Sequence, residues 1–367
     1  MKGLFIADFD TKDNKNSGIT KKIQGMYRAF LNNNIEMDLM FGEDFYTVFK
    51  INNTKIKLIS NSRQNRYNMI LEKIKEKKYD FIFIRYMLSN YFFVQFLQKI
   101  KEINSKIKIV IEFPTMPYDD EIKNSRILKI DIYYRKLLNK YVDLAISYNK
   151  MEKVLGIRAF VIGNGIEIEG KDVLKYKDMD ENKIKLIGVG SIARWHGYDR
   201  VIKGIGKYNL RNKQYNIEFT IVGEGEEVKN LVNIINDLNI NDYVRVIGYK
   251  KGEELFKLYE EADIGIGTLN RSRINLKDGS ALKHREYCCV GLPFLYAGDD
   301  IDFDENFEYA LKIDDDEEDV NIESVIEFIK SRKSNKLYPI DMRKYAELHL
   351  DWNSKVKRII DQIYNCS

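Results

Sequence analysis

Short apolar runs alternate with helical patterns along the whole chain, and the series starts twice. The strand-like runs are residues 3–9, 35–41, 80–86, 106–113 and 143–147 in the first series, and residues 183–190, 217–223, 244–249 and 262–268 in the second. Helical patterns, such as Ile19 to Leu31 and the segment from Tyr198, lie between them. Strands this apolar, each followed by a helix, indicate parallel sheets covered on both faces. We therefore predict two doubly wound α/β domains.

The boundary between the two domains is predicted within VIGNGIEIEG, residues 161–170. Asn164-Gly165 is a strong turn signal, and a polar stretch follows before the next strand. We assign residues 1–165 to the first domain and residues 166–345 to the second. Residues 346–367 carry an amphipathic helical pattern, and we expect this helix to cross back and pack on the first domain.

The composition is that of a soluble globular protein, since the 367 residues are 44% apolar and 32% charged. The three cysteines, Cys288, Cys289 and Cys366, show no disulfide framework or metal-ligand spacing, so we expect a reducing, cytoplasmic setting and no metal. The N-terminus turns acidic too soon for a signal peptide. The most apolar region, residues 81–97, is interrupted by polar side chains and is expected to form a strand, a loop and a helix instead of a membrane span.

The formal net charge of +4 hides an asymmetry between the two halves of the chain. Residues 1–165 hold 29 Lys and Arg against 18 Asp and Glu, a net of +11, and residues 166–367 hold 31 against 38, a net of −7. A basic first half suggests an anionic partner, either a membrane surface or a phosphate-bearing acceptor. Nucleic acid is not expected as a partner, because no binding motif for it is present. The alternative is a set of lysine-rich helices that are simply solvated.

The segment DGSALKHREYCCVGLP, residues 278–293, predicts a short helix with reactive groups at its start. We expect Ser280 to be the N-cap and residues 281–290 to be helical. Lys283 and Glu286 then share one face near the helix N-terminus, where free backbone N–H groups favour a phosphate. A carboxylate one turn further along suits a sugar diol. The alternative is a capped surface helix with an intrahelical Lys–Glu pair.

Ligands of open parallel sheets bind at the carboxyl ends of the strands, and with two such domains the crevice between them is the default site. Three segments of the second domain end a strand and begin a helix, namely residues 189–200, 221–228 and 278–293. The candidate chemistry of the second domain is therefore expected in these three segments.

Together with the strand at residues 244–249, which ends in V-I-G-Y, these segments contain a series of motifs. In chain order they are G-S-x-x-R-W-H-G-Y-D-R, V-G-E-G-E, V-I-G-Y and D-x7-E, the last followed by G-L-P. This series resembles the second domain of retaining GT-B glycosyltransferases of family 4, whose last motif is usually E-x7-E. NSGITKKIQG, residues 16–25, is similar to the family's first glycine loop, GNGIE, residues 163–167, to the end of its first domain, and the tail with Trp352 to the helix that crosses back. The order and spacing of the motifs, more than any one of them, carry the resemblance.

The resemblance implies a donor site for a nucleotide sugar. Glu286 would hold the ribose hydroxyls, Asp278 would contact the transferred sugar, and the helix N-terminus would cradle the diphosphate. The other positions that it assigns to donor binding are Gly18, Gly223, Gly225, Gly248, Tyr249, Gly279, Ser280, Ala281 and Leu282.

The phosphate-binding pair that is usual in the family differs here, since Ser191 and His196 stand where an Arg and a Lys are expected. We expect Arg194 and Lys283 to supply the lost charge, in preference to Arg200. His196 could also donate a hydrogen bond to phosphate, and the alternative is a packed structural residue.

The first domain lacks the His that many relatives carry near the transferred sugar. The segment EFPTMPYDDE, residues 112–121, ends a strand there instead. We take Glu112 as a candidate for proton handling and Tyr118, Asp119 and Glu121 as candidate acceptor contacts. The alternative is a loop shaped by proline, with solvated acids.

The activity that the resemblance implies is a metal-independent, retaining transfer of a hexose from a nucleotide sugar, with UDP favoured and no cofactor. Cations and the helix dipole would stabilise the leaving diphosphate, which could itself accept the acceptor's proton. We expect a lipid-linked glycan acceptor at the cytoplasmic face of the membrane, in bacterial surface polysaccharide synthesis. A catalytically silent sugar-nucleotide-binding partner of another transferase and a GT-B sugar-nucleotide epimerase stay open as alternatives.

Overall fold

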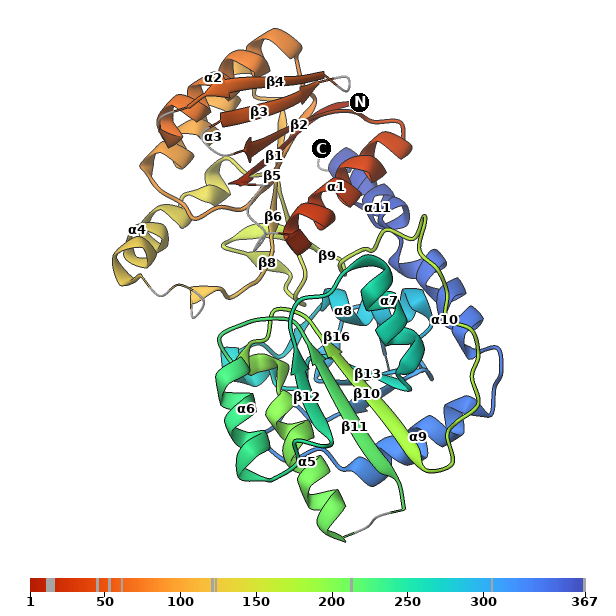
Figure 1. The fold of residues 1–367 in the computed structure, drawn as a ribbon. Coiled ribbons are helices and arrows are strands. Elements are labelled where there is room, and N and C mark those ends of the chain that lie inside the picture. The colour runs from red at the N-terminus through yellow and green to blue at the C-terminus, as the bar shows by residue number, and fades with distance from the viewer. Residues whose placement is uncertain are drawn as a thin grey trace. The chain divides into compact units, whose positions relative to one another are not determined.

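The computed structural model describes residues 1–10, 17–43, 46–51, 54–60, 62–119, 122, 124–211, 214–304 and 306–365. The chain forms two compact α/β units (Figure 1). The first consists of Met1–Gly165 together with Trp352–Ser367, and the second of Ile166–Asp351. Glu121, one of the predicted acceptor contacts, lies outside the described residues.

The first unit is built on one sheet, with the strand order β4-β3-β2-β1-β5-β6-β7-β9-β8 among the described residues. The strands from β2 to β9 in this order run parallel, and the hairpin β3-β4 and the short β8 extend the sheet in antiparallel fashion. The strands are β1 Lys2–Asp10, β2 Glu36–Glu43, β3 Tyr46–Ile51, β4 Thr54–Ile59, β5 Phe81–Arg85, β6 Lys108–Phe113, β7 Leu144–Ser147, β8 Lys153–Val154 and β9 Ile157–Val161. The helices are α1 Ser17–Asn32, α2 Arg63–Lys77, α3 Tyr91–Ile103, α4 Ser125–Arg135, the 3-10 turn η3 Leu138–Lys140 and α11 Trp352–Tyr364.

The most apolar region, residues 81–97, forms β5, a loop and the start of α3, as the sequence predicts. Asn90 ends the loop because its side chain accepts a hydrogen bond from the N–H of Phe93 at 2.9 Å and so caps α3. Among the described residues, no helix has both the length and the apolarity that crossing a membrane requires.

The C-terminal helix α11 packs against α1 within the first unit. Two glycines leave room for its tryptophan, since a Cβ on Gly25 would lie 2.6 Å from the Trp352 ring and a Cβ on Gly165 would lie 2.4 Å from it. The prediction that the C-terminal helix packs on the first domain is confirmed. Helix α11 begins at Trp352, later than the predicted start of this segment at residue 346.

The second unit contains a six-stranded parallel sheet with the order β12-β11-β10-β13-β15-β17 among the described residues. Its strands are β10 Lys183–Val189, β11 Asn216–Val222, β12 Val244–Ile247, β13 Ile264–Ile266, β15 Phe294–Ala297 and β17 Ala310–Ile313, with a separate small pair, β14 Asp278–Gly279 and β16 Asp299–Asp300. The helical segments are η4 Arg194–His196, α5 Tyr198–Arg211, α6 Val228–Asp237, α7 Gly252–Glu261, η5 Arg271–Ile274, α8 Leu282–Val290, α9 Ile322–Lys333, α10 Tyr338–Tyr345 and the π-helical η6 Ala346–Leu350.

The strand order of the second sheet reverses between β10 and β13, because the chain first builds outward from β10 to β12 and then continues on the other side of β10. In open α/β sheets, ligands bind outside the carboxyl ends of the strands at such a switch point. The fold predicted from the sequence, two doubly wound α/β domains, is confirmed, and this point is where a ligand site of the second unit is expected.

Candidate anion-binding site at the switch point of the second sheet

A lysine ammonium lies beside the loop that leaves β10. Lys283 is in the first turn of α8, and its Nζ donates a hydrogen bond to the Tyr198 hydroxyl at 2.9 Å. A Cβ built on Gly190, the residue after β10, would lie only 3.4 Å from this Nζ. Among the described residues, no carboxylate forms an ion pair with Lys283. The switch point therefore holds a cation whose partner in the described structure is neutral.

The surroundings of Lys283 disfavour its charge. Burial, followed by repulsion from the Arg271 guanidinium, lowers the pKa of Lys283 from 10.5 to about 7. An anion bound next to the ammonium would raise this pKa again, since an opposite charge favours the protonated form. Lys283 is therefore suited to bind an anion, and its charge depends on whether the anion is present.

His196 lies next to Lys283 but is held neutral. It is 8% exposed, and its Nδ1 accepts a hydrogen bond from the Ala193 N–H at 3.4 Å. Burial, with the nearby positive charge of Lys283, places its pKa well below 6.5. The ring packs against Tyr198, with 5.5 Å between ring centroids. These surroundings favour the packed structural residue that the sequence analysis kept as an alternative.

The loops after β10 and β11 approach each other through glycines. A Cβ on Gly223 would lie 1.9 Å from the Gly190 carbonyl oxygen, and a Cβ on Gly225 would lie 2.0 Å from the Ile192 carbonyl oxygen. The Ile192 N–H donates to the Glu224 carbonyl at 2.7 Å. The close backbone approach that these two glycines allow is therefore made against the neighbouring loop.

Replacing Gly223 with Ala is expected to destabilise the protein by about 1–3 kcal/mol. Gly223 has φ +138°, which a residue with a Cβ rarely adopts, and the Gly190 carbonyl would have to move. The melting temperature measures the effect. Gly248→Ala is the control, because the nearest atom to its Cβ would be 4.0 Å away, and equal melting temperatures for the two variants would contradict the prediction.

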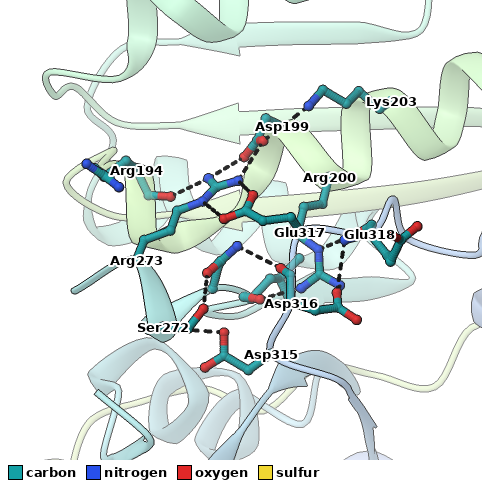
Figure 2. A network of polar contacts seen from close by, with 12 residues as sticks. Arg194, Asp199, Arg200, Lys203, Ser272, Arg273, Asp315, Asp316, Glu317 and Glu318 are labelled. Atoms are coloured by element: carbon teal, nitrogen blue, oxygen red, sulfur yellow. Dashed lines mark hydrogen bonds and ion pairs between the residues drawn. The ribbon is translucent and has the colours of Figure 1, made fainter. Parts of the chain in front are cut away.

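Arg273 of η5 connects η4 with the loop at residues 314–318 through a network of polar contacts (Figure 2). The Arg273 guanidinium donates to both carboxylate oxygens of Asp199, at 2.8 and 2.9 Å, and to the Arg194 carbonyl at 2.8 Å. It also pairs with Glu317. The Arg194 side chain points away from this network and is exposed, as is Ser191. These bonds fix the backbone of Arg194, while the Arg194 guanidinium stays open to solvent.

The Arg200 side chain is buried and bonded to other residues of the second unit. It is 3% exposed, and its guanidinium donates to the carbonyls of Leu269, Asp314 and Glu318 and pairs with Asp316. These bonds hold the loop that follows β17. The partners of Arg200 thus give its charge a structural role.

Helix α8 begins one residue later than predicted. Its N-cap is Ala281, which makes no side-chain capping bond, so the prediction of Ser280 as N-cap is wrong. The reason is that Asp278 and Gly279 are extended and pair with Asp299 and Asp300 as β14 and β16. The Arg271 side chain lies against this pair, 3.3 Å from where a Gly279 Cβ would be. Leu282, the first helical residue, is exposed.

A buried ionic cluster lies under α8, formed by residues that the sequence analysis did not single out. Asp300 is 5% exposed, accepts from the His284 Nδ1 at 2.9 Å and from the Arg285 Nη1 at 2.6 Å, and lies 3.9 Å from Arg271. Burial alone would raise the pKa of Asp300, but Arg285 and His284 hold it far below its usual range. His284 and Arg285 directly follow Lys283 in sequence, and only their complete burial reveals their role.

Glu286 is on α8 one turn after Lys283 and is partly exposed. Its Oε1 lies 3.8 Å from the Lys171 Nζ. Gly248 and Tyr249 directly follow β12 at the same carboxyl edge of the sheet, and Tyr249 is 54% exposed. The second unit therefore brings the loops that carry Gly190, Gly223 and Gly248 to one edge, together with the start of α8.

The candidates of the first unit have more varied surroundings. Glu112 is completely buried, where Lys22 pairs with it at 2.7 Å, Arg85 at 3.3 Å and the Tyr148 hydroxyl donates to it at 2.7 Å. Although burial opposes the charge, these cations lower the pKa of Glu112 to about 2. Such a carboxylate is a weak base, and this environment favours a structural role.

Tyr118 and Asp119 also have partners within the first unit. The Tyr118 hydroxyl is buried and donates to Asp131 at 2.6 Å, and Asp119 pairs with Arg135. Gly18, in the first turn of α1, is exposed and has open space where a Cβ would be. Of these, Asp119 and Gly18 are the ones whose surfaces a ligand can reach.

Comparisons with known proteins agree with this geometry. Residues 172–297 match the model of the family Glycosyl transferases group 1, so this segment is similar to a domain of that family. An uncharacterized glycosyltransferase of Methanocaldococcus jannaschii is 25% identical over an alignment of 270 positions, which covers 67% of this chain and 65% of that protein. The match thus spans just under two thirds of the relative's length.

Solved structures resemble the chain over its full length. Sucrose-phosphate synthase from Thermosynechococcus elongatus has a TM-score of 0.65 at 10% identity, with all of both chains covered. HepE of Anabaena, solved in complex with UDP, has a TM-score of 0.63 at 14% identity, again with all of both chains covered, and a further structure of it contains UDP-glucose. The chain therefore has the GT-B fold that the sequence motifs predict.

Proposed function

We propose that this chain, whose residues 172–297 match the model of the glycosyl transferases group 1 family, is a retaining glycosyltransferase that moves a hexose from a nucleotide sugar. The observation that carries the proposal is the partly desolvated ammonium of Lys283 at the switch point, next to the N-terminus of α8, which forms an ion pair with no carboxylate of the described residues. A helix N-terminus and a cation with a lowered pKa together suit a diphosphate.

In this proposal the donor lies along the carboxyl edge of the second sheet. Lys283 and the exposed Arg194 bind the diphosphate, together with the backbone N–H groups at the start of α8. Glu286 accepts hydrogen bonds from the ribose hydroxyls, and Asp278 contacts the sugar. The loop at Gly248 and Tyr249 receives the base. UDP is the favoured nucleotide, and the UDP and UDP-glucose complexes of HepE support that choice.

The transfer breaks the bond between the anomeric carbon and the diphosphate oxygen and forms a bond from that carbon to the acceptor oxygen on the same face. Lys283 and the α8 dipole stabilise the charge that develops on the leaving diphosphate. The acceptor's proton passes to an oxygen of that diphosphate. We propose that the acceptor is a lipid-linked glycan used in bacterial surface polysaccharide synthesis at the inner face of the membrane, and the excess positive charge of residues 1–165 supports an anionic acceptor.

A thermal-shift series with UDP-, GDP-, dTDP- and ADP-sugars tests donor binding. A UDP-sugar at a hundredfold excess over its dissociation constant is expected to stabilise the protein by about 2.7 kcal/mol. Glu286→Ala is expected to remove most of this shift because the ribose loses its acceptor. Glu254→Ala, whose side chain is exposed on α7, is the control and should keep the shift.

The proposal fails if none of the four sugar nucleotides raises the melting temperature of the unaltered protein. A shift without any release of UDP, in the presence of lipid-linked acceptors, would instead favour a catalytically silent binding partner.

A further inference from the structure

Helix α4, Ser125–Arg135, buries an acid and exposes apolar side chains, which is unusual for a surface helix. Its completely buried residue is Asp131, whereas Ile127, Ile130 and Tyr133 are 45%, 41% and 66% exposed. A water-facing helix normally buries its apolar positions and exposes its acids. Figure 1 shows α4 at the periphery of the first unit. The outward side of this helix is therefore matched to an environment less polar than water.

Polar bonds attach α4 to the first unit. Asp131 accepts hydrogen bonds from the Ser89 N–H and from the hydroxyls of Tyr86 and Tyr118, each at 2.6 Å. At the end of the helix, Arg135 pairs with Asp119. None of the apolar side chains of α4 belongs to the hydrophobic clusters formed by the described residues. The helix is thus firmly oriented, yet it contributes its apolar side chains to no described core.

The exposed apolar surface continues onto the start of α3. Tyr91 and Phe92 are 50% and 38% exposed, and the Tyr91 ring lies 6.3 Å from the Tyr134 ring, which in turn lies 4.9 Å from the Tyr133 ring. We name this surface the aromatic face, and its members are Tyr91, Phe92, Ile127, Ile130, Tyr133 and Tyr134. A contiguous patch of this kind on a globular protein marks an interaction surface.

Basic side chains accompany the aromatic face. Residues 122–140 contain six Lys and Arg against one acid, Asp131, which is buried. Arg126, Lys129 and Lys136 are exposed on or beside α4. Tyrosines beside aliphatic residues suit the interfacial layer of a bilayer, and lysines and arginines there are attracted by anionic lipid headgroups.

We propose that the aromatic face is a docking surface for an anionic membrane, into whose interfacial layer α4 places Ile127, Ile130 and Tyr133. A second copy of the chain fits this surface less well, because a symmetric contact would bring the same basic side chains of both copies together. This proposal rests on the proposed function, in which the acceptor is linked to a membrane lipid. The aromatic face would bring the protein to the membrane that contains this acceptor. Docking itself requires neither the donor site nor turnover.

Vesicle flotation of the full chain tests the proposal, with vesicles of phosphatidylcholine alone and of an equal mixture of phosphatidylcholine and phosphatidylglycerol. The protein is expected to float with the mixed vesicles and to stay behind with the neutral ones. Each basic side chain at an anionic surface contributes about fivefold to partitioning, so removing three should weaken it on the order of a hundredfold. The basic triple variant is Arg126→Gln, Lys129→Gln and Lys136→Gln.

A second variant tests the apolar part of the surface. Its substitutions are Ile127→Ser, Ile130→Ser and Tyr133→Ser, and it should lose flotation even with the basic residues in place. The control removes three leucines of the second unit that are 88%, 59% and 71% exposed, Leu210→Ser, Leu337→Ser and Leu348→Ser, and should float as the unaltered protein does. The UDP-glucose thermal shift, measured on every variant, shows that each is folded and separates a failure of docking from a failure of donor binding.

The membrane proposal is overturned if the unaltered protein ignores mixed vesicles or if the apolar triple variant still floats. It is also overturned if sedimentation shows a dimer that only the apolar triple variant abolishes, since the face would then be an interface between copies.

Discussion

Lys283→Met is expected to weaken UDP-glucose binding by about 2–5 kcal/mol, which is roughly thirtyfold or more in the dissociation constant. Methionine keeps the length and the apolar contact against Tyr198 but removes the charge that the diphosphate would meet. The dissociation constant from titration calorimetry measures the effect. The protein itself should lose little stability, because the substitution removes a cation that no described carboxylate pairs with.

The pH dependence of binding distinguishes a direct role of Lys283 from a structural one. In the free protein the pKa of Lys283 is about 7, and a bound diphosphate raises it, so binding takes up a proton above that pH. The affinity for UDP-glucose should therefore be highest below pH 7 and fall by up to tenfold per pH unit above it. Lys283→Arg stays charged throughout and should remove this dependence.

A pH-independent affinity in the unaltered protein, or a Lys283→Met variant that binds as tightly as the unaltered one, would contradict the assignment of Lys283 to the diphosphate. Arg194 would then be the remaining candidate from the sequence, and Arg194→Gln would be the variant to measure next.

Asp300→Ala is expected to have the largest effect on stability, about 3–5 kcal/mol. The substitution leaves Arg285 completely buried with Asp302 as its remaining carboxylate, and it removes the acceptor of the His284 Nδ1. Removing one partner of a buried ion pair costs more than the pair is worth, because the other charge stays desolvated. Chemical denaturation followed by the fluorescence of Trp195, which belongs to the second unit, measures the change in a Trp352→Phe background that removes the other tryptophan.

The neighbouring residue supplies a matched control. The Asp299 side chain is half exposed and pairs with Lys312 at 2.8 Å, so Asp299→Ala should change the stability by less than about 1 kcal/mol. Similar losses in the two variants would show that the β14-β16 pair, and not the buried charge, determines the stability of this region.

The fold could be read from the sequence because it rests on local patterns. Each buried strand is a short apolar run, as in residues 183–189 and 217–222, and each is followed by a helical period. The helix of the 278–293 segment was also predictable, since Gly291 ends it in a left-handed conformation with φ +81°. Its start was not, because Asp278 and Gly279 pair with Asp299 and Asp300, about twenty positions away.

The candidate site was predictable only in part. The spacing of Lys283 and Glu286 places both near the start of one helix whatever the helix packs against. His284 and Arg285 lie between them in sequence and also have polar side chains, yet both are buried and form hydrogen bonds with Asp300. Which charged residues of a short helix face inward depends on the residues that pack under it, and the sequence of the helix does not contain them.

Glu112 illustrates the same limit in the first unit. The sequence places it correctly near the end of a strand, where an acid could serve an acceptor. The structure surrounds it with Lys22 from α1, Arg85 from β5 and Tyr148, which are between 27 and 90 positions away. Ion pairs between such distant residues form only when the sheet brings strand ends together, so the pKa of Glu112 is a property of the tertiary structure.

The sequence by itself therefore determined the two α/β units, the order of their strands and helices, and the segments that end strands at one edge of the second sheet. Those features follow from hydrophobic periodicity, glycine and chain direction, which act over a few residues. Only the tertiary structure decided which charges are available to a ligand. Arg285 and Glu112 are used in buried ion pairs and Arg200 in hydrogen bonds to backbone carbonyls, whereas Lys283 is left without a described carboxylate, because desolvation and pairing depend on neighbours that folding supplies.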